Sequence, residues 1–443
     1  MNIVAVIVFI LDILGGATNN SASVTIDLRD GNWHHVVLTK TATKFTAYLD
    51  KQEKISVTNA TGSSLQKGNE WSFGKGNYGD ANSDFKVDQA RYFKSVLEQE
   101  DIDKLYAETE PDNDDLSFGA PKETIISANA NAGFSIVKFT NSSPGSNARI
   151  PHGLSATPNM IIVKRTDGTE NWYVYHSGMG TSKFMRLDLP NAQGTATNLF
   201  NTVNSTVFNP SFTNTAGQTC MAYCFHDISN YQKFGSYTGT GSAGQTITTG
   251  FKSDFILIKS TFGTSNWMLY DTRRGVNGFL NPDNPDTETS DSLSPNITIT
   301  STGFSITSGG VSQGLNQNTR LYIYWAIAKN VPSNTTLANS FKAVIYSGDA
   351  TNNRAIDVGF QPDMVWLKTR NQTNDHNLID TIRGVNKQVR SDRDIAEVTN
   401  ADLIKSFTST GFTLGTGGDA NASGNTYVAW AWKAGNTWQS NID

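Results

Sequence analysis

The sequence has few charged residues, and it contains no cluster of basic residues. Only 17% of the 443 residues are charged, against about 25% in typical globular domains. The 35 Lys and Arg stand against 40 Asp and Glu, which gives a formal net charge of −5. Without a basic block to neutralise phosphates, nucleic acid is not an expected partner. Asn, Ser, Thr and Gly take the place of charge, which suits an all-β chain with many turns that works outside a cell.

The chain also has only two cysteines, and their spacing argues against a disulfide. Cys220 and Cys224 stand four positions apart in the strand-like run TCMAYCF. On a strand they share a face but lie about 13 Å apart, which is too far for a bridge. We therefore expect two small buried side chains and no disulfide framework.

Signatures of common cofactor and nucleophile chemistry are missing as well. The sequence holds no P-loop, and no GxSxG elbow or dinucleotide fingerprint within a βαβ pattern, and its six histidines show no metal-ligand spacing. We expect no enzyme activity, no cofactor and no metal. The densest carboxylates stand in NPDNPDTETSD, Asn281 to Asp291, a pattern typical of an exposed loop. A calcium site or a glycosidase-type carboxylate pair is the alternative there.

The apolar N-terminal run is too short to span a bilayer. It extends from Ile3 to Leu14, is interrupted by Asp12 and has no basic region before it. Two interpretations stay open: a signal or anchor, and a buried strand or a start placed inside a longer reading frame. We expect no membrane insertion.

Residues 20–107 alternate apolar and polar positions in the manner of strands and close on a short helical pattern. Four motifs stand out: DGNWHHVVLT, TAYLDKQ, FGKG and VDQARYFKSVLEQEDIDKLYAE. They resemble the laminin-G-like, concanavalin-type jelly roll, of which they cover only the later strands. The resemblance implies a partial jelly roll at 1–108, in which Lys51 replaces the glycine that usually follows the turn aspartate.

The same resemblance implies a ligand site at the rim between strands, where that family often carries calcium or sugar. The loop GNYGDANSD supplies carboxylates, amides and a stacking ring from Asn77, Tyr78, Asp80, Asn82 and Asp84. These are the groups that sugar recognition uses, so we take them as candidate ligand-binding residues. A plain surface loop is the alternative.

The rest of the chain is a threefold repeat that follows an acidic, proline-bearing linker. The aligned residues Phe139, Tyr237 and Tyr346 fall roughly a hundred positions apart, which is the size of a β-sandwich of about six to eight strands. No helical period is sustained, so we expect three tandem β-sandwich repeats with almost no helix. The predicted boundaries are 109–124 for the linker and 125–232, 233–333 and 334–443 for the repeats.

Each repeat ends on an aromatic strand: TCMAYCF, RLYIYWAIAK and TYVAWAWKAG. In the last of these, Val428, Trp430 and Trp432 point one way and smaller residues point the other. We expect the large face to fill each module's own sandwich core. The small face would then allow another sheet or chain to approach closely.

A second repeated motif carries opposite charges. DTRRG begins at Asp271 and DTIRG at Asp380, and the spacing predicts an Asp–Arg ion pair that fixes the turn before the glycine. His176 stands at the equivalent position of the first copy. Because the copies differ there, we expect a scaffold role and no catalytic imidazole.

The three copies resemble modules of virion and tail-fibre proteins of marine bacteriophages. Such modules often follow a laminin-G-like domain and often close on YVAWAWKAG. The resemblance implies an extracellular chain in the virion tail, commonly a homotrimer, with other tail proteins and a host-surface glycan or receptor as partners. We therefore expect an extended tail fibre or tail-associated adhesin that binds weakly and multivalently. The alternatives are a secreted or cell-surface bacterial lectin-like adhesin and a polysaccharide depolymerase.

Overall fold

The chain divides into two compact units, Met1–Asp115 and Leu116–Asp443. The computed structural model describes residues 6–13, 20–27, 36–40, 44–50, 52–58, 123–140, 149–180, 182–196, 199–210, 217–290, 296–329, 336–435 and 437–440. Nearly all of their regular structure is antiparallel strand, which confirms the all-β prediction.

The described part of the first unit consists of five strands in two sheets. β1 (Val6–Ile13) pairs with β2 (Asn20–Asp27), and the second sheet contains β3 (Val36–Lys40), β4 (Lys44–Leu49) and β5 (Gln52–Thr58). The described part of the apolar N-terminal run is thus a strand. Leu49 pairs with Gln52 across a two-residue turn, and Asp50 itself takes the left-handed conformation at φ 48°. Aspartate tolerates the left-handed conformation, so the turn forms although no glycine follows Asp50.

Two expectations for this unit concern residues that the structure does not describe. The candidate ligand loop at 76–84 and the helical pattern near the end of the jelly roll both lie outside the described residues. In the described part of the chain, no helix combines the length and apolarity needed to cross a bilayer.

The second unit is built from three modules, each with a large and a small antiparallel sheet. In module 1, which spans residues 123–225, the central strand β15 (Thr219–Phe225) lies between β7 (Phe134–Thr140) and β9 (Met160–Arg165). The large sheet continues through β10 (Tyr173–His176), β11 (Lys183–Arg186) and β12 (Gly194–Thr195) on one side, and through β6 (Glu123–Asn129) and β34 (Thr437–Ser440) on the other. The small sheet is β13 (Leu199–Val203), β14 (Val207–Pro210) and β8 (Ile150–Pro151), and the 3-10 turns are η1 (Ala130–Ala132) and η2 (Ser177–Met179).

Module 2 spans residues 232–328 and repeats this plan. Its large sheet has the order β16 (Gln232–Thr238), β24 (Leu321–Ala328), β18 (Ser253–Ser260) and β19 (Met268–Asp271). Its small sheet is β17 (Gln245–Thr248), β23 (Gly303–Ile306) and β22 (Ile297–Thr300), with β20 (Gly278–Phe279) and β21 (Thr289–Ser290) forming a separate pair. The short helix α2 (Ser308–Ser312) follows the small sheet.

Module 3 spans residues 341–432. Its large sheet has the order β25 (Phe341–Ser347), β33 (Thr426–Trp432), β27 (Met364–Thr369), β28 (Asn377–Asp380), β29 (Lys387–Arg390) and β30 (Val398–Thr399). Its small sheet is β26 (Arg354–Asp357), β32 (Gly411–Leu414) and β31 (Ile404–Thr408), followed by α3 (Gly418–Asn421) and preceded by η3 (Thr336–Asn339). The strand register supports the predicted alignment, because Phe139, Tyr237 and Tyr346 pair with equivalent residues of the three aromatic strands.

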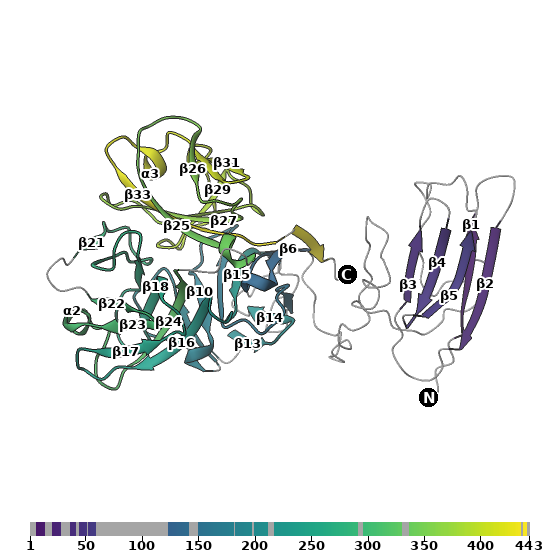
Figure 1. Ribbon diagram of the computed structural model, residues 1–443, viewed down its shortest axis with the longest axis horizontal. Coiled ribbons are helices and arrows are strands. Elements are labelled where there is room, and N and C mark those ends of the chain that lie inside the picture. Colours follow the sequence, from purple (N-terminus) through teal and green to yellow (C-terminus); the bar gives the residue numbers. More distant parts are fainter. Residues whose placement is uncertain are drawn as a thin grey trace. The chain divides into compact units, whose positions relative to one another are not determined.

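The three modules share one central core, contrary to the expectation of an extended string. Figure 1 shows them grouped around a common centre, with the last strand, β34, beside β6. The large faces of β15, β24 and β33 meet there through Phe225, Trp325 and Trp432. Ring centroids lie 4.4 Å apart for Phe225 and Trp325, and 5.8 Å apart for Trp325 and Trp432. Burying each such ring removes about 150–250 Å² from water and contributes several kcal/mol.

The assignment of the two strand faces is therefore the reverse of the predicted one. The small faces, such as Ala429 and Ala431 of β33, fill each module's own sandwich core, whereas the large faces meet the other modules. In β15 and β33 small side chains there let the three-stranded sheet approach closely, whereas β24 also presents Tyr322 and Tyr324 to its own core. Bulky rings fill the wider space between the three modules. Cys220 and Cys224 belong to the small face of β15 and are free and buried, as predicted.

An equivalent buried lysine ties each module to the next: Lys164, Lys259 and Lys368. Each ammonium donates to backbone carbonyls, of which at least one belongs to another module: Lys164 to Asp394 O at 2.8 Å, Lys259 to Asn191 O at 2.9 Å, and Lys368 to Pro285 O at 3.2 Å. The contacts run from module 1 to 3, from 3 to 2 and from 2 to 1, so they form a closed ring. Burial, offset in part by nearby carboxylates, lowers the pKa of each lysine to about 8.

The free energy of unfolding is expected to rise between about pH 8 and about pH 9.5. The ordinary lysine pKa is about 10.4, so in this window the unfolded chain binds more protons than the folded one. Urea titrations at the two pH values measure the change, and Lys259→Met should show a smaller rise than the parent chain. A midpoint independent of pH would contradict the burial of these charges.

Candidate functional site

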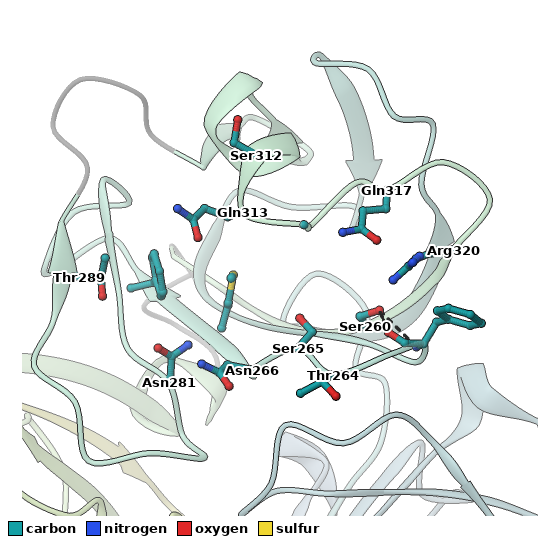
Figure 2. Close-up of a pocket in the computed structure, with 14 residues that line it drawn as sticks. Ser260, Thr264, Ser265, Asn266, Asn281, Thr289, Ser312, Gln313, Gln317 and Arg320 are labelled. Carbon is teal, nitrogen blue, oxygen red and sulfur yellow. Dashed lines mark hydrogen bonds between the residues drawn. The ribbon is translucent and has the colours of Figure 1, made fainter.

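A pocket of about 480 Å³ opens on module 2. Figure 2 shows it between the segment that links β18 to β19, the β20–β21 pair, and the segment from α2 to β24. Its lining consists of Ser260, Phe262, Thr264, Ser265, Asn266, Met268, Phe279, Asn281, Thr289, Ser312, Gln313, Gly314, Gln317 and Arg320. Hydroxyls and amides predominate over a floor of buried Met268 and Phe279, Arg320 is the one charged residue, and the lining contains no carboxylate.

An exposed aromatic ring stands at the rim of this pocket. Phe262 is 60% exposed, although large apolar side chains are normally covered. Its backbone is fixed by Ser260, whose hydroxyl donates to Phe262 O at 2.9 Å and accepts from Phe262 N at 3.2 Å. Gly263 continues the turn at φ +67°, where any other residue would be strained. The guanidinium of Arg320 covers one side of the ring at 4.5 Å from its centroid.

The opposite wall, residues 313–320, is held from below by two buried side chains. The Tyr322 hydroxyl donates to Gly314 O at 2.5 Å and accepts from Gln317 N at 3.0 Å. The Asn316 amide donates to Ser242 O at 2.7 Å. No hydrogen bond within the described residues engages the side chain of Gln317, which faces the pocket in Figure 2. The backbone of the wall is thus fixed while its amide stays available to a ligand.

The rim and one wall of this pocket differ between module 2 and the other two copies. Phe304 and Leu321 lie 17 positions apart, whereas their counterparts Phe412 and Thr426 in module 3 lie 14 apart, so module 2 has a longer wall. At the position of Phe262 the other modules carry Asp167 and Asn371. The three copies therefore differ at this surface, although their large sheets meet in one central core.

Charged and aromatic side chains occupy the equivalent surface in the sister modules. Asn281 lines the pocket floor beside Met268, and the corresponding cross-strand pairs are Tyr173 with Arg186 and Asn377 with Arg390. In module 1, Arg186 lies over the Tyr173 ring at 5.9 Å. In module 3, Arg390 pairs with Asp375 at 2.8 Å.

The acidic stretch from Asn281 is only in part the exposed loop that its composition predicts: Asp286 and Thr287 are exposed, whereas residues 281–283 are buried. Asp283 is buried and accepts from Trp267 N at 3.1 Å, and burial raises its pKa to about 7. Pro282 O accepts from Ser391 of module 3 at 2.9 Å, so this part of the stretch lies at a contact between modules. Among the described residues, no group of three or more His, Cys, Asp or Glu could hold a metal ion.

The predicted ion pairs are present and buried. Arg274 Nε lies 2.5 Å from Asp271, and Arg383 Nε lies 2.7 Å from Asp380. Their carboxylates also accept across module boundaries, from Trp430 Nε1 at 3.2 Å and from the Tyr223 hydroxyl at 2.9 Å respectively. The scaffold interpretation is confirmed and extended, because these pairs join modules as well as fixing turns.

His176 is a scaffold residue too. Its Nδ1 accepts from Gly178 N at 3.0 Å, and its Nε2 lies 3.1 Å from Tyr324 O of module 2. Burial lowers its pKa to about 4, so it is neutral at pH 7.

Sequence reasoning placed the candidate ligand residues in the first unit and missed the pocket. Asn77, Tyr78, Asp80, Asn82 and Asp84 lie outside the described residues, so they stay a prediction. Two signals could have revealed the pocket: the aromatic Phe262 where the sister copies are polar, and the longer segment before Leu321. Both emerge only when the copies are compared position by position.

Comparison with known proteins matches a family model to each of the two parts of the chain. Neither the curated proteins nor the solved structures include a match to the chain. Residues 9–103 match the concanavalin A-like lectin/glucanases superfamily, which confirms the laminin-G-like resemblance of the first unit. Residues 122–332 and 336–443 match a second family model, which covers most of the chain. The chain therefore belongs to the family described as a domain of unknown function, DUF7483.

Proposed function

We propose that this chain is a glycan-binding adhesin of a bacteriophage virion tail, and that the module 2 pocket contacts a saccharide on the host surface. The observation that carries the proposal is a pocket of hydroxyls and amides with an exposed ring at its rim, in the one copy of the repeat that has phenylalanine at this position. Its volume of about 480 Å³ falls within the range of about 300–1,000 Å³ that is usual for ligand sites.

The chemistry of the lining suits a saccharide. Serine, threonine, asparagine and glutamine can each donate to and accept from sugar hydroxyls. The exposed face of Phe262 offers an apolar surface for the C–H face of a sugar ring. Because the lining has no Asp or Glu, this pocket offers no carboxylate pair of the kind that glycoside hydrolysis uses. Binding is therefore favoured here over depolymerisation.

The virion assignment rests on the resemblance of the repeats to marine phage tail modules and on the laminin-G-like domain that precedes them. One pocket per chain gives one weak contact, so useful avidity requires several chains displayed together. That requirement supports the proposals of a homo-oligomer, such as a trimer, and of other tail proteins as partners. Antibody labelling of intact particles tests the location; label on a bacterial surface and on no particle would favour the secreted or cell-surface adhesin.

Replacing Phe262 by alanine is expected to weaken saccharide binding about tenfold or more, the loss of about 1.4 kcal/mol of contact energy. Its side chain is 60% exposed, so stability should change little. The measurement is a glycan array with the full-length chain, followed by titration of the best ligand. Ile345→Ala is the matched control, because Ile345 is 45% exposed on module 3. Equal binding by all three proteins would remove the pocket from the proposal.

The wall of the pocket gives a second prediction with a built-in control. Tyr322→Phe removes the hydroxyl that holds Gly314 and Gln317, and should cost about 1–2 kcal/mol of stability and lower saccharide affinity. Tyr427 is its counterpart in module 3, where the hydroxyl accepts from Ala422 N and donates to Gly418 O. Tyr427→Phe should cost similar stability, measured by urea unfolding, yet leave affinity unchanged. Equal loss of affinity in both variants would show a general effect of destabilisation.

A further inference from the structure

The charge of the pocket points to a class of ligand, and this inference rests on the proposed function. Arg320 is the one charged residue in the lining, and no carboxylate among the described residues forms a salt bridge with it. The arginines at the contacts between modules differ: Arg274 pairs with Asp271 at 2.5 Å, and Arg370 pairs with Glu288 at 2.5 Å. A cation at the mouth of a pocket that has no anionic partner in the protein can pair with an anionic group of a ligand.

Two described acids that stand close to lining residues in the sequence are already engaged. Glu288, next to Thr289 of the lining, holds Arg370 and also lies 3.7 Å from Arg274. Asp283 accepts from the backbone of Trp267 and is buried. Neither of these two carboxylates forms an ion pair with Arg320, so its positive charge is available to a ligand.

The position of Arg320 suits an anion that has a planar or tetrahedral array of oxygens. Its guanidinium lies over the Phe262 ring, with Cζ 4.5 Å from the ring centroid. Contact with a ring takes up none of the N–H groups of a guanidinium, which can form paired hydrogen bonds with an anion. The ring also restricts the side chain, so less conformational freedom is lost on binding.

We propose that the module 2 pocket binds an acidic saccharide, with Arg320 donating to its carboxylate or sulfate group. The hydroxyls and amides of the lining would hold the sugar hydroxyls, and the Phe262–Arg320 pair would hold the charged group at the rim. Specificity follows from the buried floor and the fixed wall, which allow one orientation of the sugar relative to the guanidinium.

The test compares three soluble polymers on the full-length chain: polygalacturonate, dextran sulfate and neutral dextran. At least one acidic polymer should bind about tenfold or more tightly than dextran. Arg320→Gln should abolish that preference and Arg320→Lys should restore part of it. Binding of polygalacturonate alone identifies a carboxylate, and binding of dextran sulfate alone identifies a sulfate ester.

The control separates the pocket from general attraction of polyanions. Arg273 is an exposed arginine of the same module outside the pocket, and Arg273→Gln removes the same charge. Equal losses from Arg273→Gln and Arg320→Gln would overturn the proposal. So would a neutral glycan that binds as tightly as the acidic polymers and is unaffected by Arg320→Gln, although saccharide binding itself would then stand. If neither these polymers nor any arrayed glycan bound the chain, the proposed function would fail as well.

Discussion

Replacing Trp430 by alanine is expected to destabilise all three modules together, by about 3–5 kcal/mol. Trp430 is fully buried in the central core, where its ring centroid lies 5.9 Å from that of Trp366 and 6.4 Å from that of Phe255 of module 2. Its indole N–H donates to Asp271, also of module 2. The lost ring therefore leaves a cavity between modules and removes one of the two side-chain donors to Asp271, which keeps its bond to Arg274.

Hydrogen exchange followed by mass spectrometry along a urea series measures this effect module by module. A shared core predicts that peptides from the three modules of the Trp430→Ala chain lose protection at one common, lowered urea concentration. Ile345→Ala, an exposed position, should shift that concentration little. If module 3 alone lost protection while modules 1 and 2 kept the parent midpoint, the modules would be independent and the shared core would be energetically unimportant.

Replacing Arg383 by methionine is expected to cost about 3–5 kcal/mol. Arg383 is 2% exposed and Asp380 is fully buried, so the variant leaves a carboxylate in the interior without its cation. The Tyr223 hydroxyl would remain as a donor to it, but a neutral hydroxyl does not balance the charge. Urea unfolding at neutral pH measures the loss.

The surface pair of module 1 provides the control for this prediction. Arg165 and Asp167 lie 2.7 Å apart, with 25% and 37% of their side chains exposed. Arg165→Met should cost about 0–1 kcal/mol, since solvent already screens that pair. A loss from Arg383→Met as small as that from Arg165→Met would mean that the repeated ion pair does not hold the modules together.

The features that could be predicted are those that depend on residues close together in the sequence. Alternation of apolar residues is a property of each strand, so the all-β class and the repeat were predictable. The spacing of Asp380 and Arg383 is also local, because a side chain three residues along a turn returns to the carboxylate. The absence of a disulfide between Cys220 and Cys224 follows in the same way, from the two-residue period of a strand.

The arrangement of the modules could not be predicted from these patterns. On β33 both faces are apolar, Trp430 on one and Ala429 on the other, so hydrophobicity alone does not say which face meets the module's own small sheet. The deciding contacts join residues far apart in the chain, such as Lys164 with Asp394. Likewise the buried Asp283 lies in a stretch whose composition is that of a loop, next to Pro282, which contacts Ser391 of the neighbouring module.

The pocket could not be predicted because it also depends on the fold. In the sequence Phe262 is one apolar residue among many, and its exposure depends on the turn formed by Ser260 and Gly263. Arg320 reaches that ring from the far end of the wall, 58 positions later in the chain. A site of this kind is formed by the fold and becomes visible in the sequence only as a departure from the repeat.

The most direct test of the central claim, that the module 2 pocket is the saccharide site, is hydrogen exchange of the full-length chain with and without its best-binding saccharide. The account predicts protection of residues 260–268 and 312–320, with no change at the equivalent sister segments 165–173 and 369–377. Protection confined to residues 76–84 of the first unit, or spread equally over the three modules, would contradict it.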